Sequence, residues 1–390
     1  MNMTPAFFAA FLLQIHLAFA LKSYLAHLAE AGYDKRENPS LPDQPVDVLL
    51  FLPFFVMVGL NEKDQIFSAQ FVLQEIWVDP RLVFDPADYN RSYIAVPNTE
   101  IWMPQFVPYN GLSVTEQYDK DRAEVVIAPN GTVYFRPVLY TECMCIMHLE
   151  DFPFDAQTCV IDFINPNLPT IFQRVYAFTA LDGFTQSVHK GTPEWDLLRL
   201  YTGSGNITYS GLYWQQAHLI VELRRRSLYY VVTTFIPVYI IVFFTICGSF
   251  ISSVGIEVDT MALSLSSLLA LTLQFSVVAD SMPRSNYLPL MGYFVIVETI
   301  IAASSVLSSL IMDYLRLRRC KDFLEKMNGG GMKEATIQKR KTENDKKEKY
   351  RFSIVGAILF WLFHILSTIT FAYCMSYIFR KRRQPSPAFY

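Results

Sequence analysis

Two acidic side chains bracket an apolar stretch of this 390-residue chain. Asp259 and Asp280 lie near the ends of the run from residue 259 to residue 283. That run is long enough to cross a bilayer as a helix. An acid near membrane depth costs roughly 2.5–3.5 kcal/mol on insertion scales, so such a residue usually faces water or a partner. The chemistry indicated by two carboxylates in these positions is the attraction of cations.

Helical spacing places both acids on one face of the predicted helix. Steps of three and four residues join them through small, hydroxyl-bearing and leucine side chains. Several copies of this face around water would form a pore, in which acids draw cations in and leucines close the path by dewetting. The alternative from the helix alone is a buried bundle helix whose acids lie in headgroup water. The predicted pore face consists of Asp259, Ala262, Ser266, Leu269, Leu273, Ser276 and Asp280.

The composition is that of a membrane protein with room for one sizeable soluble domain. Of the residues, 52% are hydrophobic, and the formal net charge is −3, which gives no indication of nucleic-acid binding. Four apolar runs are long enough to span a bilayer, and Pro237 inside the first predicts a kink. The predicted spans are residues 228–251, 259–282, 288–315 and 352–379.

Charge and leader patterns predict the orientation of these spans. The Lys- and Arg-rich segment 316–351 is predicted to be a cytoplasmic loop by the positive-inside rule, with a flexible joint at 328–331. Residues 1–20 resemble a signal peptide, the alternative being an N-terminal amphipathic helix. Both termini, including a tail at 380–390, are then extracellular. Residues 21–31 predict a helix that ends at Gly32.

Between residues 46 and 221 the pattern changes to short β-branched and aromatic runs separated by turn signals. These signals are Asn61-Glu62, Asn110-Gly111, Asn130-Gly131 and the segment 203–205. The pattern predicts an all-β domain of sandwich type within an extracellular region, residues 21–227. Three sequons, at Asn90, Asn130 and Asn206, predict glycosylation sites in a secreted domain.

Two cysteines in this β region enclose thirteen residues. A disulfide between Cys145 and Cys159 is expected in an extracellular domain, worth roughly 3 kcal/mol in the chain-entropy model. The alternative is two unpaired buried thiols. Cys143 would share the face of Cys145 on a strand, so it is either a leftover thiol or a rival partner for Cys159.

The enclosed loop contains Phe152, Pro153, Phe154 and Asp155. A thirteen-residue loop with these residues, in a β domain followed by four spans, resembles the Cys-loop pentameric ligand-gated ion channels. Further segments are similar. WVDPRL at 77–82 resembles the family's WxDxRL strand and IWMP at 101–104 its WxP loop. RRRSLYY at 224–230 and LLALT at 268–272 are closest to nicotinic acetylcholine receptors.

The resemblance implies a fold and an assembly. The fold is an extracellular immunoglobulin-like β-sandwich followed by a four-helix transmembrane bundle, pentameric around the second helix. Asp259 then falls on the inner acidic ring, Leu269 on the leucine gate and Asp280 on the outer acidic ring. Anion channels of the family usually carry Pro-Ala near the inner end, where this chain has Glu257-Val258. Because of the acidic rings and the missing Pro-Ala, cation selectivity is expected. Ala262 leaves the narrow inner region without the hydroxyl ring of many members.

The family's agonist site lies between subunits and holds a cationic amine by cation–π attraction. Here the match is partial. Gln105 replaces the usual acid, Pro166 stands at the usual aromatic position, and no adjacent cysteine pair follows Tyr201. Arg136 would repel an amine and suit a carboxylate, the alternative being a surface ion pair. The predicted ligand-binding residues are Trp102, Gln105, Arg136, Pro166, Tyr201, Tyr209, Tyr213 and Trp214.

Coupling between ligand and pore is expected at the tip of the disulfide loop. Residues 152–155 should meet the linker 284–288 after the pore helix, and Asp155 should pair with a cation of the segment 224–226. The alternative is that these charges are solvated. The predicted coupling residues are Phe152, Pro153, Phe154, Asp155, Arg224, Arg225 and Arg284.

These observations predict a multi-pass plasma-membrane subunit of a homo- or heteropentamer. A small-molecule agonist at the subunit interface would open a pore for monovalent cations, with membrane lipid around it. No catalytic residues, metal site or cofactor are predicted, because the sequence has no phosphate loop, metal-spaced His cluster or triad. The alternatives are an accessory subunit without a working agonist site, an anion-selective member, or a non-conducting four-span receptor or adhesion protein.

Overall fold

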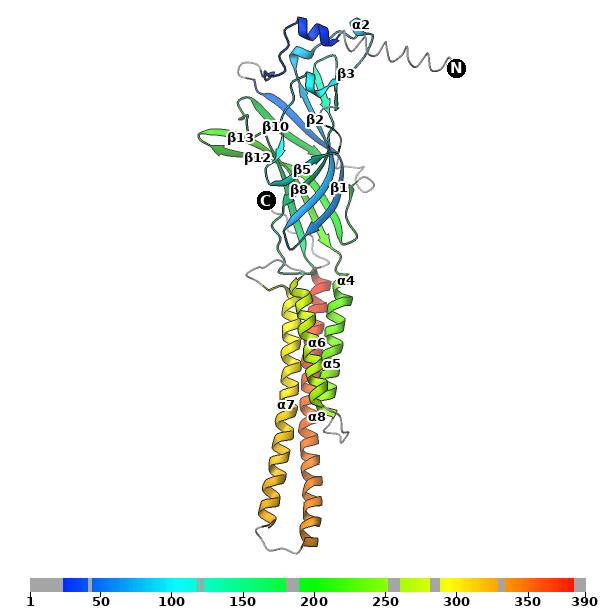
Figure 1. Cartoon of the computed structure of the whole chain (residues 1–390), viewed down its shortest axis with the longest axis vertical. Helices are drawn as coiled ribbons and strands as arrows, with labels where there is room; N and C mark the ends of the chain where they lie inside the picture. Colours follow the sequence, from blue (N-terminus) through cyan, green and yellow to red (C-terminus); the bar gives the residue numbers. More distant parts are fainter. Residues whose placement is uncertain are drawn as a thin grey trace, which may run out of the picture. The chain divides into compact units, whose positions relative to one another are not determined.

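The computed structural model describes residues 24–40, 44–117, 119, 123–179, 189–251, 260–280, 288–328 and 334–381. The chain forms two compact units (Figure 1). The first, Met1–Met147 with Ala156–Arg224, is built of strands, and the second, His148–Asp155 with Arg225–Tyr390, is built of helices and one short loop segment. The predicted β domain followed by membrane helices is confirmed. The predicted signal peptide, Asp259 and Arg284 lie outside the described residues.

The β unit contains two sheets. The described part of the larger sheet has nine strands in the order β10-β1-β2-β7-β6-β3, with β11 beside β1, β8 beside β2 and β5 beside β8. The smaller sheet has the order β12-β13-β9-β4. The strands of the larger sheet are β1 (Val46–Asn61), β2 (Ile66–Val78), β3 (Ile94–Pro97), β5 (Gly111–Glu116), β6 (Glu124–Ile127), β7 (Thr132–Phe135), β8 (Val138–Met144), β10 (Gln173–Thr179) and β11 (His189–Lys190). Those of the smaller sheet are β4 (Val107–Pro108), β9 (Ala156–Ile164), β12 (Trp195–Tyr209) and β13 (Leu212–Arg225).

Aromatic side chains fill the space between the two sheets. Phe55 of β1 stacks on Phe67 and Phe71 of β2, at centroid distances of 6.4 Å in both cases. Phe163 of β9 meets Phe71 edge to face at 5.9 Å, which joins the smaller sheet to the larger. All four rings are buried. Burial of such large apolar surfaces is the main favourable contribution to folding of this unit.

Most of the predicted turns are present, and one prediction is wrong. β1 ends at Asn61, Gly111 begins β5, and Asn130-Gly131 joins β6 to β7. Gly203–Gly205, predicted as a turn, lies inside β12; the turn is at Ser210-Gly211, both with positive φ. The glycine inside the strand has a packing reason, because a Cβ on Gly205 would come within 2.6 Å of His218 Nε2.

The second unit consists of helices with apolar stretches. Three stretches within the described residues are long and apolar enough to cross a membrane: Leu228–Phe250, Leu290–Arg319 and Ile354–Tyr377. A shorter apolar stretch, Ser264–Asp280, belongs to the 21-residue helix α6, which at about 1.5 Å per residue is about 32 Å long. The elements are α4 (Leu228–Tyr230), η4 (Val231–Phe235), α5 (Ile236–Ile251), α6 (Thr260–Asp280), α7 (Leu290–Asn328) and α8 (Glu334–Lys381).

The first span is irregular just before Pro237, and the predicted kink itself stays a prediction. The five residues of η4, immediately before α5, form a π-helical turn rather than a regular α-helix. Proline has no N–H to donate to the carbonyl four residues earlier, and its ring crowds that carbonyl. Wider turns of this kind relieve such crowding inside helices.

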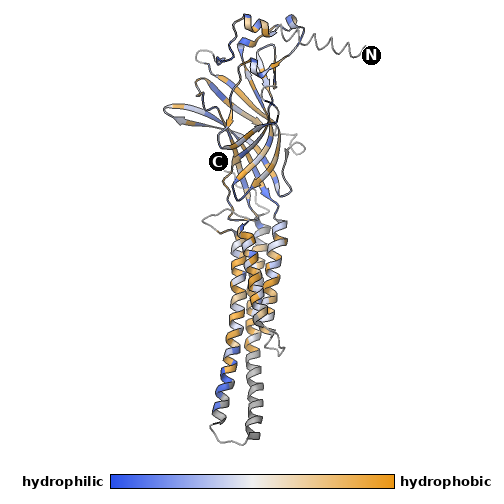
Figure 2. Cartoon of the chain, in the orientation of Figure 1, coloured by the Kyte–Doolittle hydropathy of each residue, from blue (hydrophilic) through white to orange (hydrophobic). Residues whose placement is uncertain are grey.

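The basic segment 316–351 is largely helical in its described part. α7 continues past residue 315 to Asn328, and α8 begins at Glu334. Figure 2 shows α7 changing from hydrophobic to hydrophilic toward its C-terminal end, where the apolar stretch gives way to charged residues. Hydropathy therefore predicts where each span stops being apolar, but not where its helix stops.

A buried carboxylate joins two of the membrane helices. Glu298 of α7 is fully buried and accepts hydrogen bonds from Ser367 Oγ, at 2.8 Å, and from Thr370 Oγ1, both on α8. Buried acids in membrane helices are expensive unless they find partners. These hydroxyl groups provide partners and fix the rotation of α8 against α7.

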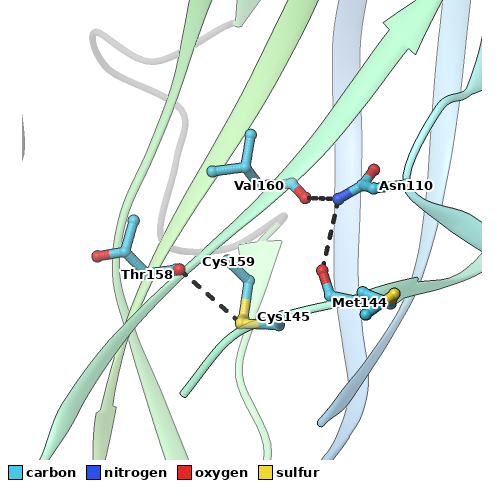
Figure 3. The surroundings of a disulfide bond; sticks show 6 residues. All are labelled: Asn110, Met144, Cys145, Thr158, Cys159 and Val160. Carbon is cyan, nitrogen blue, oxygen red and sulfur yellow. Dashed lines mark hydrogen bonds between the residues drawn. A yellow bond between two sulfur atoms is a disulfide. The ribbon is translucent and has the colours of Figure 1, made fainter. Parts of the chain in front are cut away.

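The predicted disulfide is present between Cys145 and Cys159. Beside it, Asn110 Nδ2 donates to the carbonyl of Val160 at 2.7 Å and lies 3.4 Å from that of Met144 (Figure 3). Cys143 of β8 is the leftover thiol. Its side chain is free and buried, and burial raises its pKa to about 12. The rival pairing with Cys143 is therefore excluded.

Replacing Cys145 and Cys159 together by Ser should lower the free energy of unfolding by about 3 kcal/mol, because the loop they close regains chain entropy when unfolded. Thermal unfolding of the purified protein under non-reducing conditions measures this change. Cys143→Ala is the matched control, since it removes a buried thiol and leaves the disulfide intact. Equal losses in the control and the double variant would contradict the assignment.

Candidate functional site

The tip of the disulfide loop carries a buried ion pair. Asp155 Oδ1 lies 2.9 Å from Arg225 Nε, and both side chains are almost fully buried, at 1% and 0% exposure. A second contact joins Asp155 Oδ2 to an Arg225 Nη at 3.3 Å, and the Arg225 N–H donates to the Asp155 carbonyl at 3.2 Å. Of the predicted cations, Arg225 is thus the partner of Asp155, whereas Arg224 lies at the end of β13 opposite Ala156.

Aromatic rings cover this pair. The guanidinium carbon of Arg225 lies 4.7 Å from the Phe152 ring centroid and 5.7 Å from that of Tyr230. Phe154 contacts Phe235 at 6.1 Å between centroids. Desolvated cation–π contacts of this kind are worth about 2 kcal/mol. The two loop phenylalanines therefore pack against Arg225 and Phe235, at the start of the first span.

Carbonyl groups of the same loop cap the start of α7. The Leu290 N–H donates to the Glu150 carbonyl at 2.9 Å, and the Met291 N–H donates to the Phe152 carbonyl at 3.3 Å. The first N–H groups of a helix lack partners within the helix, so the loop supplies them. Near the other end of the chain, the Tyr377 hydroxyl of α8 donates to Asp151 Oδ1. The loop is therefore hydrogen-bonded to α7 and α8 as well as to Arg225.

One face of α6 is exposed in the single chain. Every described member of the predicted pore face is exposed, including Leu269 at 61% and Leu273 at 60%. The opposite face is buried at Ser264, Leu271 and Val278, where α6 packs against α5 and α7. The helical spacing derived from the sequence thus separates the exposed side of α6 from its packed side.

Trp102 has a scaffolding environment that the sequence did not indicate. Its backbone N–H donates to Tyr33 Oη at 2.9 Å, and Tyr33 donates to Asp79 Oδ2 at 3.1 Å. Arg81 binds both oxygens of the fully buried Asp79, at 2.9 and 2.8 Å. Burial raises the pKa of the Tyr33 hydroxyl, so it remains a neutral donor. The 77–82 motif therefore holds the Trp102 loop in place.

Two of the eight predicted ligand-binding residues border one cleft of about 610 Å³. It lies between segments 35–38, 98–105 and 165–168, and Trp102 and Gln105 are in its wall together with both neighbours of Pro166. Trp102 is 7% exposed and packs edge to face on Trp77 at 6.2 Å. Little of its ring is therefore open to a ligand.

The predicted tyrosines form a separate group at the hairpin of β12 and β13. Tyr209 and Trp214 contact each other at 6.2 Å between centroids, while Tyr209 and Tyr213 are 72% and 58% exposed. Tyr201 lies further along β12, and burial is the main cause of its raised pKa. Arg136 is exposed between β7 and β8. None of these residues borders the cleft as the structure describes it.

Sheet order adds an aromatic residue that the motif comparison missed. Tyr109 follows β4, is largely exposed, and donates its N–H to the Asp162 carbonyl at 2.6 Å. β4 pairs with β9 near Ile164, two residues before Pro166. An exposed ring therefore stands beside the loop that lacks the usual aromatic. No local signal marks this position, since the strand pairing is long-range.

The three sequon asparagines are all exposed. Asn90 ends α2 (Pro86–Tyr89) in a left-handed conformation, Asn130 lies in the β6–β7 turn, and Asn206 lies near the end of β12. Their side chains are accessible to modification, and glycosylation stays a prediction.

Replacing either Asp155 by Asn or Arg225 by Gln should lower the free energy of unfolding by about 3–5 kcal/mol, because each change leaves a buried polar partner uncompensated. The double variant should lose less than the sum of the two single variants. Thermal unfolding of the purified protein measures all three. The control is Arg174→Gln, which breaks an exposed pair with Asp47 worth about 0–1 kcal/mol. Additive losses at Asp155 and Arg225 would contradict the pairing.

Comparison with known proteins agrees with this architecture. Residues 21–172 match the family described as the neurotransmitter-gated ion-channel ligand binding domain. The acetylcholine receptor subunit alpha-type des-2 of Caenorhabditis elegans is 27% identical over 310 residues, which cover 74% of this chain and 55% of that protein. The acetylcholine receptor subunit gamma of Gallus gallus is 25% identical, covering 74% and 58%. The neuronal acetylcholine receptor subunit alpha-9 of Rattus norvegicus is 27% identical, covering 70% and 56%.

The chain thus spans little more than half the length of these relatives. By their names these relatives are receptor subunits, and the described part of this chain has three helical stretches long and apolar enough to cross a membrane. The matched domain, the disulfide loop and the helices that follow agree with one another. The chain is thus similar, over residues 21–172, to the neurotransmitter-gated ion-channel ligand binding domain, and over about three quarters of its length to acetylcholine receptor subunits.

Proposed function

We propose that the chain is a subunit of a pentameric ligand-gated channel in which α6 lines a cation-selective pore. The observation that carries the proposal is the exposed stripe of α6. Ala262, Ser266, Leu269, Leu273 and Ser276 are exposed along one side, and Asp280 is exposed at the end of the same side.

Such a stripe requires water or a partner along its length. Lipid would cover the leucines but leave the Asp280 carboxylate at the end of the stripe without water, which is costly at membrane depth, although Ser266 Oγ already donates to the Ala262 carbonyl at 2.9 Å. Several copies of α6 around an aqueous axis provide water for Asp280 and the serines. Leu269 and Leu273 then form the apolar constriction that opens and closes.

Coupling in this proposal runs through the disulfide loop. The loop is continuous with β8 and β9, and its carbonyl groups and Asp155 bind α7 and Arg225. A ligand that favours one of two packings of this loop shifts the population of open pores by its difference in affinity between them.

The agonist in this proposal is a small molecule bound at a subunit boundary. Tyr209 and Tyr213 are available for such contact, and exposed Arg136 suits a carboxylate-bearing agonist. A second candidate function is an accessory subunit whose agonist site works only with a partner. Pro166 in place of an aromatic residue, and the near-complete burial of Trp102, favour it.

Expression of this chain alone should give agonist-evoked currents across a panel of amine and carboxylate transmitters, if it forms a homomeric receptor. Whole-cell recording measures the currents, and surface labelling confirms delivery to the membrane. Silence with full surface expression, followed by currents on co-expression with a second subunit, would establish the accessory role. Absence of five-fold symmetry in purified particles would overturn the assembly.

Neutralising the two acids, by Asp259→Asn with Asp280→Asn, should reduce single-channel cation conductance about twofold or more, because rings of carboxylates concentrate cations in the pore. The loss should be larger at low ionic strength, where screening is weaker. Glu30→Gln, which removes an exposed acid outside α6, is the control. Unchanged conductance would contradict the pore assignment, and a reversal potential that follows chloride in the original chain would overturn cation selectivity.

A further inference from the structure

The cleft bordered by segments 35–38, 98–105 and 165–168 has the dimensions of a ligand site. Its volume is about 610 Å³, within the range of roughly 300–1,000 Å³ typical of small-molecule pockets. The tyrosines of the β12–β13 hairpin, which belong to the proposed agonist site, do not border it in the described structure. The cleft thus shares Trp102 and Gln105 with the predicted ligand-binding residues and differs from them in the rest of its wall.

The charged side chains that border this cleft in the described structure are both cationic. Lys35 Nζ donates to the Thr99 carbonyl at 2.7 Å, which holds the ammonium group at the cleft and leaves two of its protons for other acceptors. Arg36 is already neutralised, since two of its nitrogens bind Asp34 at 2.9 and 2.8 Å. Those hydrogen bonds lower the pKa of Asp34 to about 2, so the neutralising charge persists. Lys35 therefore supplies a positive charge that no acid in the cleft wall offsets.

None of the described residues that border the cleft carries a carboxylate, although Glu37 and Glu100 are exposed in the same segments. Gln105 stands where the resembled family usually carries an acid three residues after Trp102, so the amide leaves this wall without that negative charge. Amide side chains of Asn98, Asn165 and Asn167 border the cleft as well.

Apolar groups complete the cleft. Ile101, Met103 and Leu168 border it together with Trp102. A ligand that fills this space needs a compact apolar body for these side chains and an anionic oxygen group for Lys35. Carboxylates form short, charge-assisted hydrogen bonds with ammonium groups, about twice as strong as neutral ones.

We propose that this cleft binds a small organic carboxylate, with its carboxylate at Lys35 and its apolar body against Ile101 and Trp102. An amine is disfavoured, because the wall has positive charge and no anion to receive it. If a neighbouring copy of the chain filled the cleft, it would exclude the ligand. The experiment below would then show no benzoate binding.

The test uses the purified full-length receptor and the probe pair benzoate and benzamide, which share an aromatic body and differ in charge. Ligand-observed saturation-transfer NMR should show binding of benzoate and at least about tenfold weaker binding of benzamide, as expected for loss of a charge-assisted contact. Inorganic phosphate should compete poorly, since it lacks the apolar body.

Variants assign the binding to the cleft. Lys35→Gln and Gln105→Glu should each weaken benzoate binding about tenfold or more, the first by removing the cation and the second by adding an anion. Lys35→Arg should retain most of it. Lys63→Gln, which removes an exposed cation on the β1–β2 turn, is the matched control, and thermal unfolding verifies that each variant is folded.

Equal binding of benzoate and benzamide, or unchanged benzoate binding in folded Lys35→Gln, would overturn the proposal. So would an absence of benzoate binding in the pentamer, the result expected if a neighbouring copy occupies the cleft. The readout is binding to purified protein, so it does not depend on currents. A receptor that binds benzoate but never conducts would contradict the proposed channel function and leave this inference standing.

Discussion

The ion pair between Asp155 and Arg225 is the constraint on which the helical unit depends. Taking two charges out of water costs several kcal/mol per ion, and only close geometry with additional hydrogen bonds offsets that cost. Here Arg225 satisfies both carboxylate oxygens and lies against the rings of Phe152 and Tyr230. Because neither group can leave its partner cheaply, the loop tip is held at the start of the first span. The Glu150 and Phe152 carbonyl groups are then in place to cap α7.

A second feature of the helical unit is the exposed stripe of α6. Within one chain, α5 and α7 cover only the side of α6 that contains Leu271 and Val278. The uncovered side mixes leucines with hydroxyl groups and ends at Asp280. This polarity pattern is what the proposed aqueous axis rests on, because water around several copies of α6 would serve Asp280 while the leucines face one another.

The sequence predicted features that rest on local spacing and missed those that rest on distant pairing. The face of α6 follows from a 3.6-residue period, and the disulfide follows from two cysteines in an extracellular β domain. The glycine-rich segment of β12 has the composition of a turn. The actual reason for its glycines is close packing against His218, which leaves no local signal in the sequence. The contacts Tyr33–Asp79, Tyr33–Trp102 and Asp151–Tyr377 join residues 46, 69 and 226 positions apart. Only tertiary structure brings such pairs together.

Departures from the family pattern carry the most specific chemical information in this chain. An acid in the WxP loop would place a negative charge beside the Lys35 ammonium, whereas Gln105 leaves that ammonium uncompensated at the cleft. Pro166 stands where the family has an aromatic ring, and exposed Tyr109 lies beside the neighbouring strand. Gln105 reduces the attraction for a cationic amine because a negative charge is missing, and Pro166 reduces it because a cation–π partner is missing. The scaffold around Trp102 is nevertheless intact, held by Tyr33, Asp79 and Arg81. A preserved frame with altered wall chemistry is what a change of ligand class requires, because specificity depends on the groups lining a site and not on the fold that presents them.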